Sequence, residues 1–178
     1  MRIFRYFSFA LFTLALTTFA SAQTPPPLSP LPPGGFAFTG TWDCRGMFGN
    51  NALHTSTYSG TTILNDTWLE LGEQDIQPGT RYIAKYLIGF DSQQKRLIEF
   101  DANTFGAAIY TSEDGWQNRV LTMTSPISSD AKAPYAANRF VYSITDNDTF
   151  TVDWQISKTA ALTWLQSDHL TCKRKSAG

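Results

Sequence analysis

Few residues in this sequence are of the types that most often carry chemistry. The chain has two histidines, His54 and His169, and two cysteines, Cys44 and Cys172. They are not clustered at the spacing of a zinc site, so we predict no metal centre and assign no role to His54. The sequence also contains no Gly-x-Ser-x-Gly elbow and no phosphate-binding glycine loop. Enzymatic activity stays open, and these absences favour a protein that is not an enzyme.

The first 22 residues have the three regions of a secretory signal peptide. Arg2 and Arg5 give a positive start, residues 7–16 are mostly apolar, and Ala20-Ser21-Ala22 is a small-residue cleavage site. A transmembrane anchor is the alternative, but hydroxyl residues interrupt the apolar run before it reaches the roughly 18 residues that a span needs. We therefore expect a secreted or periplasmic protein that does not insert into a membrane once the signal is removed.

A proline-rich segment, residues 23–35, follows the predicted signal. It holds six of the nine prolines of the chain. Such a run favours an extended polyproline II conformation and lacks donors for a sheet, so we interpret it as a linker outside the core. Without Arg2 and Arg5 the chain has 12 basic and 15 acidic residues, a formal net charge of −3. This charge disfavours nucleic acid and anionic lipid as partners.

Residues 36–178 form the predicted globular domain, and their main signal is alternation of apolar and polar residues in short segments. This pattern is typical of strands with one buried and one solvated face. Eight to ten such strands with short connections predict an all-β domain, either a closed antiparallel up-and-down barrel or a two-sheet sandwich. The clearest segments are 38–48, 82–88, 98–102, 140–144 and 150–156.

The two cysteines favour the barrel. In an exported protein they most simply form a disulfide, which would join the first predicted strand at Cys44 to the last at Cys172. If these strands pair antiparallel and close a barrel, the position numbers of opposite residues have a constant sum, here 216. The same register places Trp42 opposite Arg174, and an arginine stacked on a tryptophan is a favourable cation–π pair.

Gly40-Thr41-Trp42 lies on the first predicted strand, and a basic residue lies near the end of the last. This combination is similar to the signature of the calycin superfamily of lipocalin-like barrels. Residues 85–91 and 95–98 are similar to a calycin-like family of bacterial exported domains of unknown function. The resemblance extends over residues 39–174. It implies one lipocalin-like barrel in which Trp42 closes one end and packs under Arg174.

The inward face of the predicted barrel is rich in aromatic residues. Tyrosine hydroxyls that project into an apolar lumen must find partners and can orient a small amphipathic molecule. We therefore expect a binding module for a small apolar or aromatic ligand. The alternative is an envelope structural or interaction protein with a filled barrel, whose protein partner is unknown. The lumen candidates are Tyr82, Tyr86, Phe100, Tyr142 and Trp154.

A weaker resemblance concerns His169. The sequence Ser167-Asp168-His169-Leu170 is similar to the region of nitrobindin, another small calycin-like barrel, in which a late-strand histidine binds haem iron. The resemblance implies haem as an alternative cofactor; we otherwise expect none. Strict alternation opposes this role, because an inward Cys172 and Arg174 would point His169 to solvent.

Overall fold

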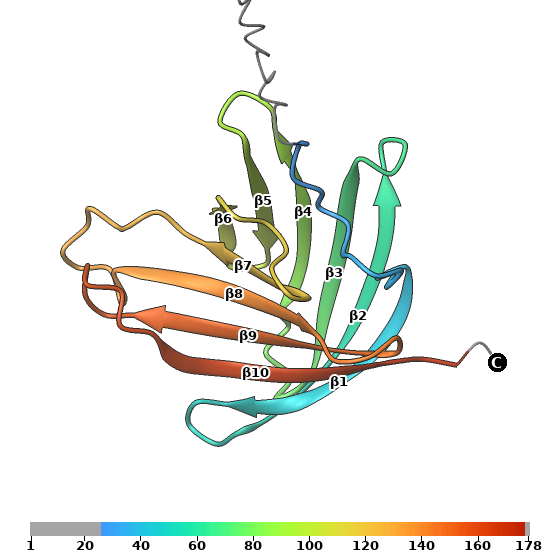
Figure 1. The fold of residues 1–178 in the computed structure, drawn as a ribbon. Coiled ribbons are helices and arrows are strands. Elements are labelled where there is room, and N and C mark those ends of the chain that lie inside the picture. Colours follow the sequence, from blue (N-terminus) through green and yellow to red (C-terminus); the bar gives the residue numbers. More distant parts are fainter. Residues whose placement is uncertain (1–25, 177–178) are drawn as a thin grey trace, which may run out of the picture.

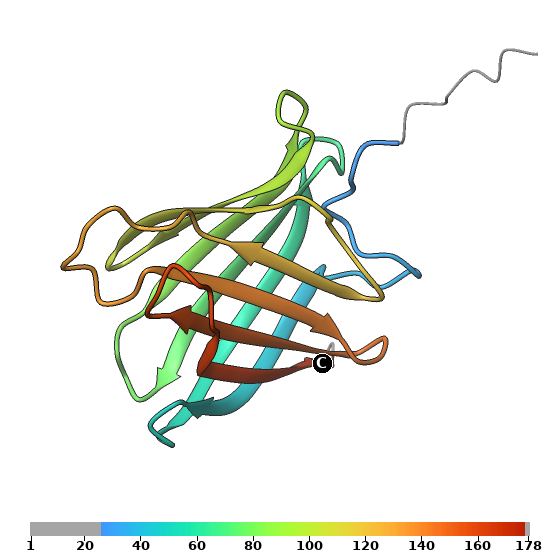
Figure 2. The same cartoon turned by 60° about the vertical axis from the view of Figure 1, so that its left-hand side comes forward.

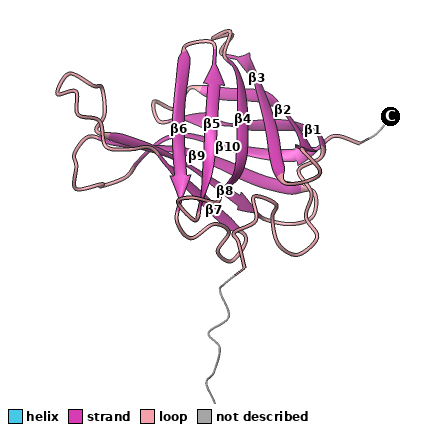
Figure 3. Cartoon of the chain, turned by 90° about the horizontal axis from the view of Figure 1, so that it is seen from above, coloured by secondary structure: helices cyan, strands magenta, loops and turns pink. Residues whose placement is uncertain are grey.

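A computed structural model describes residues 26–176 as strands and loops (Figures 1 and 3). The predicted signal peptide, residues 1–22, lies outside this range. No helix in the described part is long and apolar enough to cross a bilayer. The ten strands are β1 (Gly40–Phe48), β2 (Leu53–Ile63), β3 (Trp68–Gln77), β4 (Ile83–Asp91), β5 (Arg96–Asn103), β6 (Gly106–Ser112), β7 (Val120–Thr124), β8 (Ala137–Ile144), β9 (Thr149–Ser157) and β10 (Leu165–Arg174).

The strands form a closed antiparallel up-and-down barrel, as predicted. Each strand pairs with its neighbour in sequence, and β1 pairs with β10 to close the sheet. The predicted register is confirmed, since Cys44 pairs with Cys172 and Trp42 with Arg174. The two cysteines form a disulfide across this seam. In Figure 2 the orange and red strands β8 to β10 form the wall opposite the green strands of the barrel.

One end of the barrel is filled by aromatic side chains around Trp42. The rings of Phe36 and Phe150 lie 5.6 and 4.9 Å from the Trp42 ring. The indole Nε1 donates a hydrogen bond to the carbonyl oxygen of Phe38, 2.8 Å away. The Arg174 guanidinium lies 4.0 Å from the indole ring centre and donates to the carbonyl oxygens of Thr39 and Ala37. Arg174 therefore ties the incoming chain to the last strand.

The proline-rich segment differs from the prediction of a separate linker. Within its described part, Pro30 is buried and Leu28 and Leu31 pack against the hydrophobic core. The indole Nε1 of Trp116 donates a hydrogen bond to the carbonyl oxygen of Pro30 at 3.1 Å. A proline carbonyl still accepts hydrogen bonds although the residue lacks an N–H. This segment therefore covers the filled end of the barrel, because its leucines bury apolar surface there.

The predicted inward faces are confirmed for β4, β8 and β9, but the prediction for β5 is wrong. Phe100 lies on the outer surface, 40% exposed, and stacks against Trp68 of β3. Gly89 leaves room for that indole, since a Cβ there would lie 2.3 Å from its ring atoms. The inward positions of β5 hold the buried carboxyl groups of Glu99 and Asp101 instead. Alternation alone gave the wrong face because this strand exposes Phe100 and buries two carboxyl groups beside Leu97.

The seam disulfide should contribute strongly to stability. It closes a loop between positions 128 residues apart. Loop-closure entropy predicts that replacing both cysteines, Cys44→Ser with Cys172→Ser, lowers the free energy of unfolding by about 3 to 5 kcal/mol. Urea denaturation followed by tryptophan fluorescence measures this difference. Equal unfolding midpoints for the oxidised wild type and the double variant would contradict the prediction.

Candidate functional site

A cavity of about 460 Å³ opens at the end of the barrel opposite Trp42. Three predicted lumen residues, Tyr82, Tyr86 and Trp154, line it. Tyr142 is buried in the core beneath and is not one of the lining residues, and Phe100 lies outside the barrel. The lumen is therefore filled at one end and hollow at the other, with aromatic walls around the hollow part.

His54 lies in the wall of this cavity, between carboxylates from two other strands. It projects inward from β2 and is only 3% exposed. Its Nδ1 is 2.9 Å from Oδ2 of Asp168 on β10, and its Nε2 is 2.8 Å from Oδ1 of Asp75 on β3. The ring of Phe48 stacks on the imidazole with a centroid distance of 4.3 Å. Both nitrogens and one ring face are thus occupied, which fixes the orientation of the imidazole.

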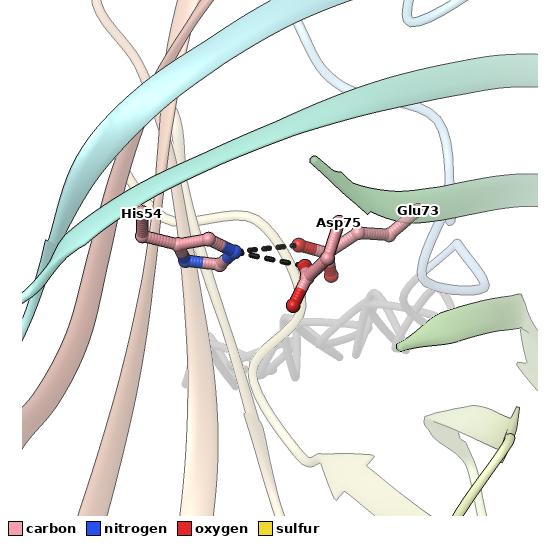
Figure 4. A group of neighbouring side chains, drawn as sticks. All are labelled: His54, Glu73 and Asp75. Atoms are coloured by element: carbon pink, nitrogen blue, oxygen red, sulfur yellow. Dashed lines mark hydrogen bonds and ion pairs between the residues drawn. The ribbon is translucent and has the colours of Figure 1, made fainter. Parts of the chain in front are cut away.

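Glu73 completes this group from the next inward position of β3. Its Oε1 lies 4.0 Å from Nε2 of His54 (Figure 4). Its Oε2 accepts hydrogen bonds from Tyr58 at 2.7 Å and from Tyr86 at 2.8 Å. The hydroxyl of Tyr82 lies 2.9 Å from that of Tyr86 and extends the network toward the cavity. The tyrosine hydroxyls thus find the buried partners that their burial requires.

The local environment shifts the pKa values of His54 and Glu73. Burial lowers the pKa of His54, but hydrogen bonds and charge interactions with Asp168 and Asp75 outweigh burial and raise the pKa to about 9. Burial raises the pKa of Glu73 to about 7, although hydrogen bonds from Tyr58 and Tyr86 oppose this shift. His54 is therefore a cation at neutral pH, surrounded by more negative than positive charge.

A second acidic pair lies on β5. Burial, followed by the charge of Asp101, raises the pKa of Glu99 from 4.5 to about 8. Burial also raises the pKa of Asp101, whose two oxygens accept hydrogen bonds from Asn103 at 3.0 and 3.1 Å. Tyr142 donates to Oε2 of Glu99 at 3.3 Å. Asp101 and Asn103 line the cavity, whereas Glu99 lies deeper.

Two buried acceptor atoms of lining residues have no hydrogen-bond partner. They are Oδ1 of Asn138, a residue only 6% exposed, and Oδ1 of Asp168. None of the described residues that line the cavity is lysine or arginine. Because unpaired buried acceptors cost free energy, the cavity favours a guest that donates hydrogen bonds or carries positive charge.

Sequence reasoning missed His54 and its carboxylate partners. Glu73 and Asp75 are two positions apart and thus share a face of one strand, which is a signal visible in the sequence. The approach of His54 and Asp168 depends on the pairing of β1 with both β2 and β10, which local patterns do not specify. The structure thus brings together a group that sequence spacing did not indicate.

His169 lies away from the cavity. Its side chain is 44% exposed, and its Nδ1 is 2.5 Å from Oδ1 of Asp153. This outward position agrees with strict alternation along β10. It is absent from the residues that line the cavity, so haem bound through His169 would need another site.

No protein-family model matches this chain, and no curated protein matches it.

The raised pKa of Glu99 predicts a pH-dependent stability. The folded protein keeps Glu99 protonated up to about pH 8, whereas the unfolded chain ionises it near its ordinary pKa of 4.5. The wild type should thus lose stability relative to Glu99→Gln as pH rises through this window, by on the order of a few kcal/mol. Urea denaturation from pH 4.5 to 8.5 measures the difference.

The control for this measurement is Glu113→Gln, since Glu113 is exposed and pairs with Arg96 on the surface. Exposed ion pairs contribute little to stability, so the free energy of unfolding of this variant should match that of the wild type at every pH. A difference between wild type and Glu99→Gln that does not change with pH would contradict the assignment.

Proposed function

We propose that this protein is an exported, calycin-like binding protein whose barrel holds a small ligand with an apolar or aromatic body. The observation that carries the proposal is the cavity of about 460 Å³ at one end of a barrel whose other end is filled. Ligand sites of small molecules are commonly about 300 to 1,000 Å³ and mostly apolar, with a few polar groups that fix orientation.

The walls of the cavity suit the body of such a ligand. Phe140 on β8, Trp154 on β9, Tyr135 before β8 and Phe105 between β5 and β6 line it. Phe105 is 75% exposed at the rim, where an apolar molecule would cover it. Burial of aromatic surface on both partners would supply most of the binding free energy.

The polar groups of the cavity restrict the ligand further. Asn138, Asp101 and Asp168 present acceptor oxygens on different strands, and no lysine or arginine among the lining residues competes for them. An amine would donate charge-assisted hydrogen bonds to these oxygens, whereas a carboxylate would be repelled. We therefore include a hydrogen-bond-donating group, best a cationic one, in the proposed ligand.

Export is supported by the disulfide, because such bonds persist mainly outside the cytoplasm. The cavity at one end of the lumen argues against a filled barrel with a purely structural role. The calycin resemblance supports the same proposal through the Trp42 and Arg174 pair at the filled end.

A pair of probes tests the ligand class. They are 2-(1-naphthyl)ethylamine and 2-(1-naphthyl)ethanol, which share an aromatic body and differ in charge. We expect one-to-one binding by calorimetry, with the amine tighter by about tenfold because its ammonium group forms charge-assisted hydrogen bonds. Trp154→Ala should weaken both probes by about tenfold or more, because it removes apolar contact area.

Trp68→Ala is the matched control, since this indole lies against Phe100 on the outer face. It should leave both affinities within about twofold of the wild type. The absence of saturable binding of either probe, or equal losses in the Trp154 and Trp68 variants, would overturn the proposed function. Equal affinity for the two probes would overturn the cationic preference alone.

A further inference from the structure

We propose that His54, Glu73 and Asp75 form a binding site for a divalent transition-metal ion in the wall of the cavity. The three residues come from two adjacent strands, β2 and β3, and all three side chains are about 95% buried. They offer one imidazole nitrogen and two carboxylate oxygens within 4.8 Å of one another (Figure 4). The proposal does not depend on an organic ligand in the same cavity.

The two distances from the imidazole nitrogen to the carboxylate oxygens are short enough for a shared ion. Nitrogen and oxygen ligands lie about 2.0 to 2.2 Å from zinc, so two donors of one ion are at most about 4.4 Å apart. Nε2 of His54 lies 2.8 Å from Oδ1 of Asp75 and 4.0 Å from Oε1 of Glu73. An ion can therefore replace the proton between His54 and Asp75 with small side-chain rotations.

In each of the three side chains, the polar atom that does not face the proposed ion forms a hydrogen bond with another residue. Nδ1 of His54 bonds to Asp168, Oε2 of Glu73 accepts from Tyr58 and Tyr86, and Oδ2 of Asp75 accepts from Thr80 at 2.5 Å. Partners of this kind are typical of metal centres, because they orient the ligands and fix the histidine tautomer. Asp168 is thus a positioning residue for His54.

The charge of the group supports a cation of higher charge than a proton. Three carboxyl groups, those of Glu73, Asp75 and Asp168, surround one imidazole, and no lysine or arginine lies among the lining residues. With all three carboxyl groups ionised and His54 protonated, the group has a net charge of −2. Replacing the Nε2 proton with an ion of two positive charges would reduce this to −1, and buried carboxylates are costly without such compensation.

The ligand types indicate the class of metal. Calcium and magnesium prefer sites made of oxygen alone, whereas imidazole with carboxylates suits zinc and neighbouring first-row ions. Cys44 and Cys172 offer no thiolate because they form the disulfide. With three protein ligands, the remaining coordination positions would face the cavity, where water or a ligand atom can occupy them.

Metal titration of the full mature protein, first dialysed against a chelator, tests the site. We expect one equivalent of Zn²⁺ to bind by calorimetry, and one equivalent of Co²⁺ to give visible absorption bands typical of a low-symmetry nitrogen and oxygen site. His54→Ala and Asp75→Asn should abolish both signals. Asp168→Asn should keep the stoichiometry and weaken binding by about 10- to 100-fold, since it removes only the orienting partner.

His169→Ala is the matched control, because His169 is the other histidine of the chain and pairs with Asp153 on the outer face. It should bind Zn²⁺ and Co²⁺ like the wild type. Glu73→Gln serves as a second ligand variant if His54→Ala does not fold, since glutamine keeps an oxygen for Tyr58 and Tyr86; circular dichroism checks folding. It should weaken binding of both ions by about tenfold or more.

Several results would overturn the proposal. They are no binding of either ion by the wild type, wild-type binding by folded His54→Ala or Glu73→Gln, or loss of binding in His169→Ala. Trp154→Ala separates this site from the proposed function, because it should weaken binding of the naphthyl probes by about tenfold or more and leave metal binding unchanged. A protein that binds the probes but no metal would refute the metal site alone, and the reverse result would refute only the organic ligand.

Discussion

The pairing of β1 with β10 is the constraint on which the rest of the structure depends. It joins the two ends of the domain, and the disulfide, the Trp42 and Arg174 pair and the closure of the sheet all lie on it. Closure pairs the first strand with the last and creates an inside. The same seam brings Asp168 of β10 beside His54 of β2, on either side of β1. Stability and the candidate site thus originate in one long-range contact.

The two ends of the lumen differ in the chemistry of the side chains that occupy them. Around Trp42, apolar rings from the strands and from the segment before β1 fill the space and exclude water. At the other end the walls carry carboxyl groups, whose burial is unfavourable unless they are paired. Tyrosine hydroxyls and one imidazole compensate Glu73, while Tyr142 reaches Glu99. An interior that retains this many acidic groups gives up packing stability, and such losses are typical of sites kept for binding.

The sequence is sufficient to predict the barrel, but it does not predict the acidic interior. The disulfide and the pairing of Trp42 with Arg174 predict the register of β1 and β10. Alternation of apolar and polar residues predicts the inward faces of β4, β8 and β9. Hydrophobicity predicts the wrong face for Phe100, because β5 buries Glu99 and Asp101 inside the barrel and leaves Phe100 outside. His54 was missed because its partners lie 21 and 114 residues away. Their approach is a property of strand order, which local residue types do not encode.

The excess of negative charge links the two proposals for the cavity. One imidazolium cannot neutralise Asp75, Asp168 and an ionised Glu73 together, and Asp101 adds further acidity on the neighbouring wall. A protein can relieve such a field by keeping protons on its carboxyl groups, as the raised pKa values of Glu73 and Glu99 indicate, or by binding a cation. An ammonium group and a metal ion are two cations of this kind, and they differ in the atoms they require. An ammonium group needs only acceptor oxygens, whereas the imidazole nitrogen held by Asp168 adds a donor that suits a metal ion.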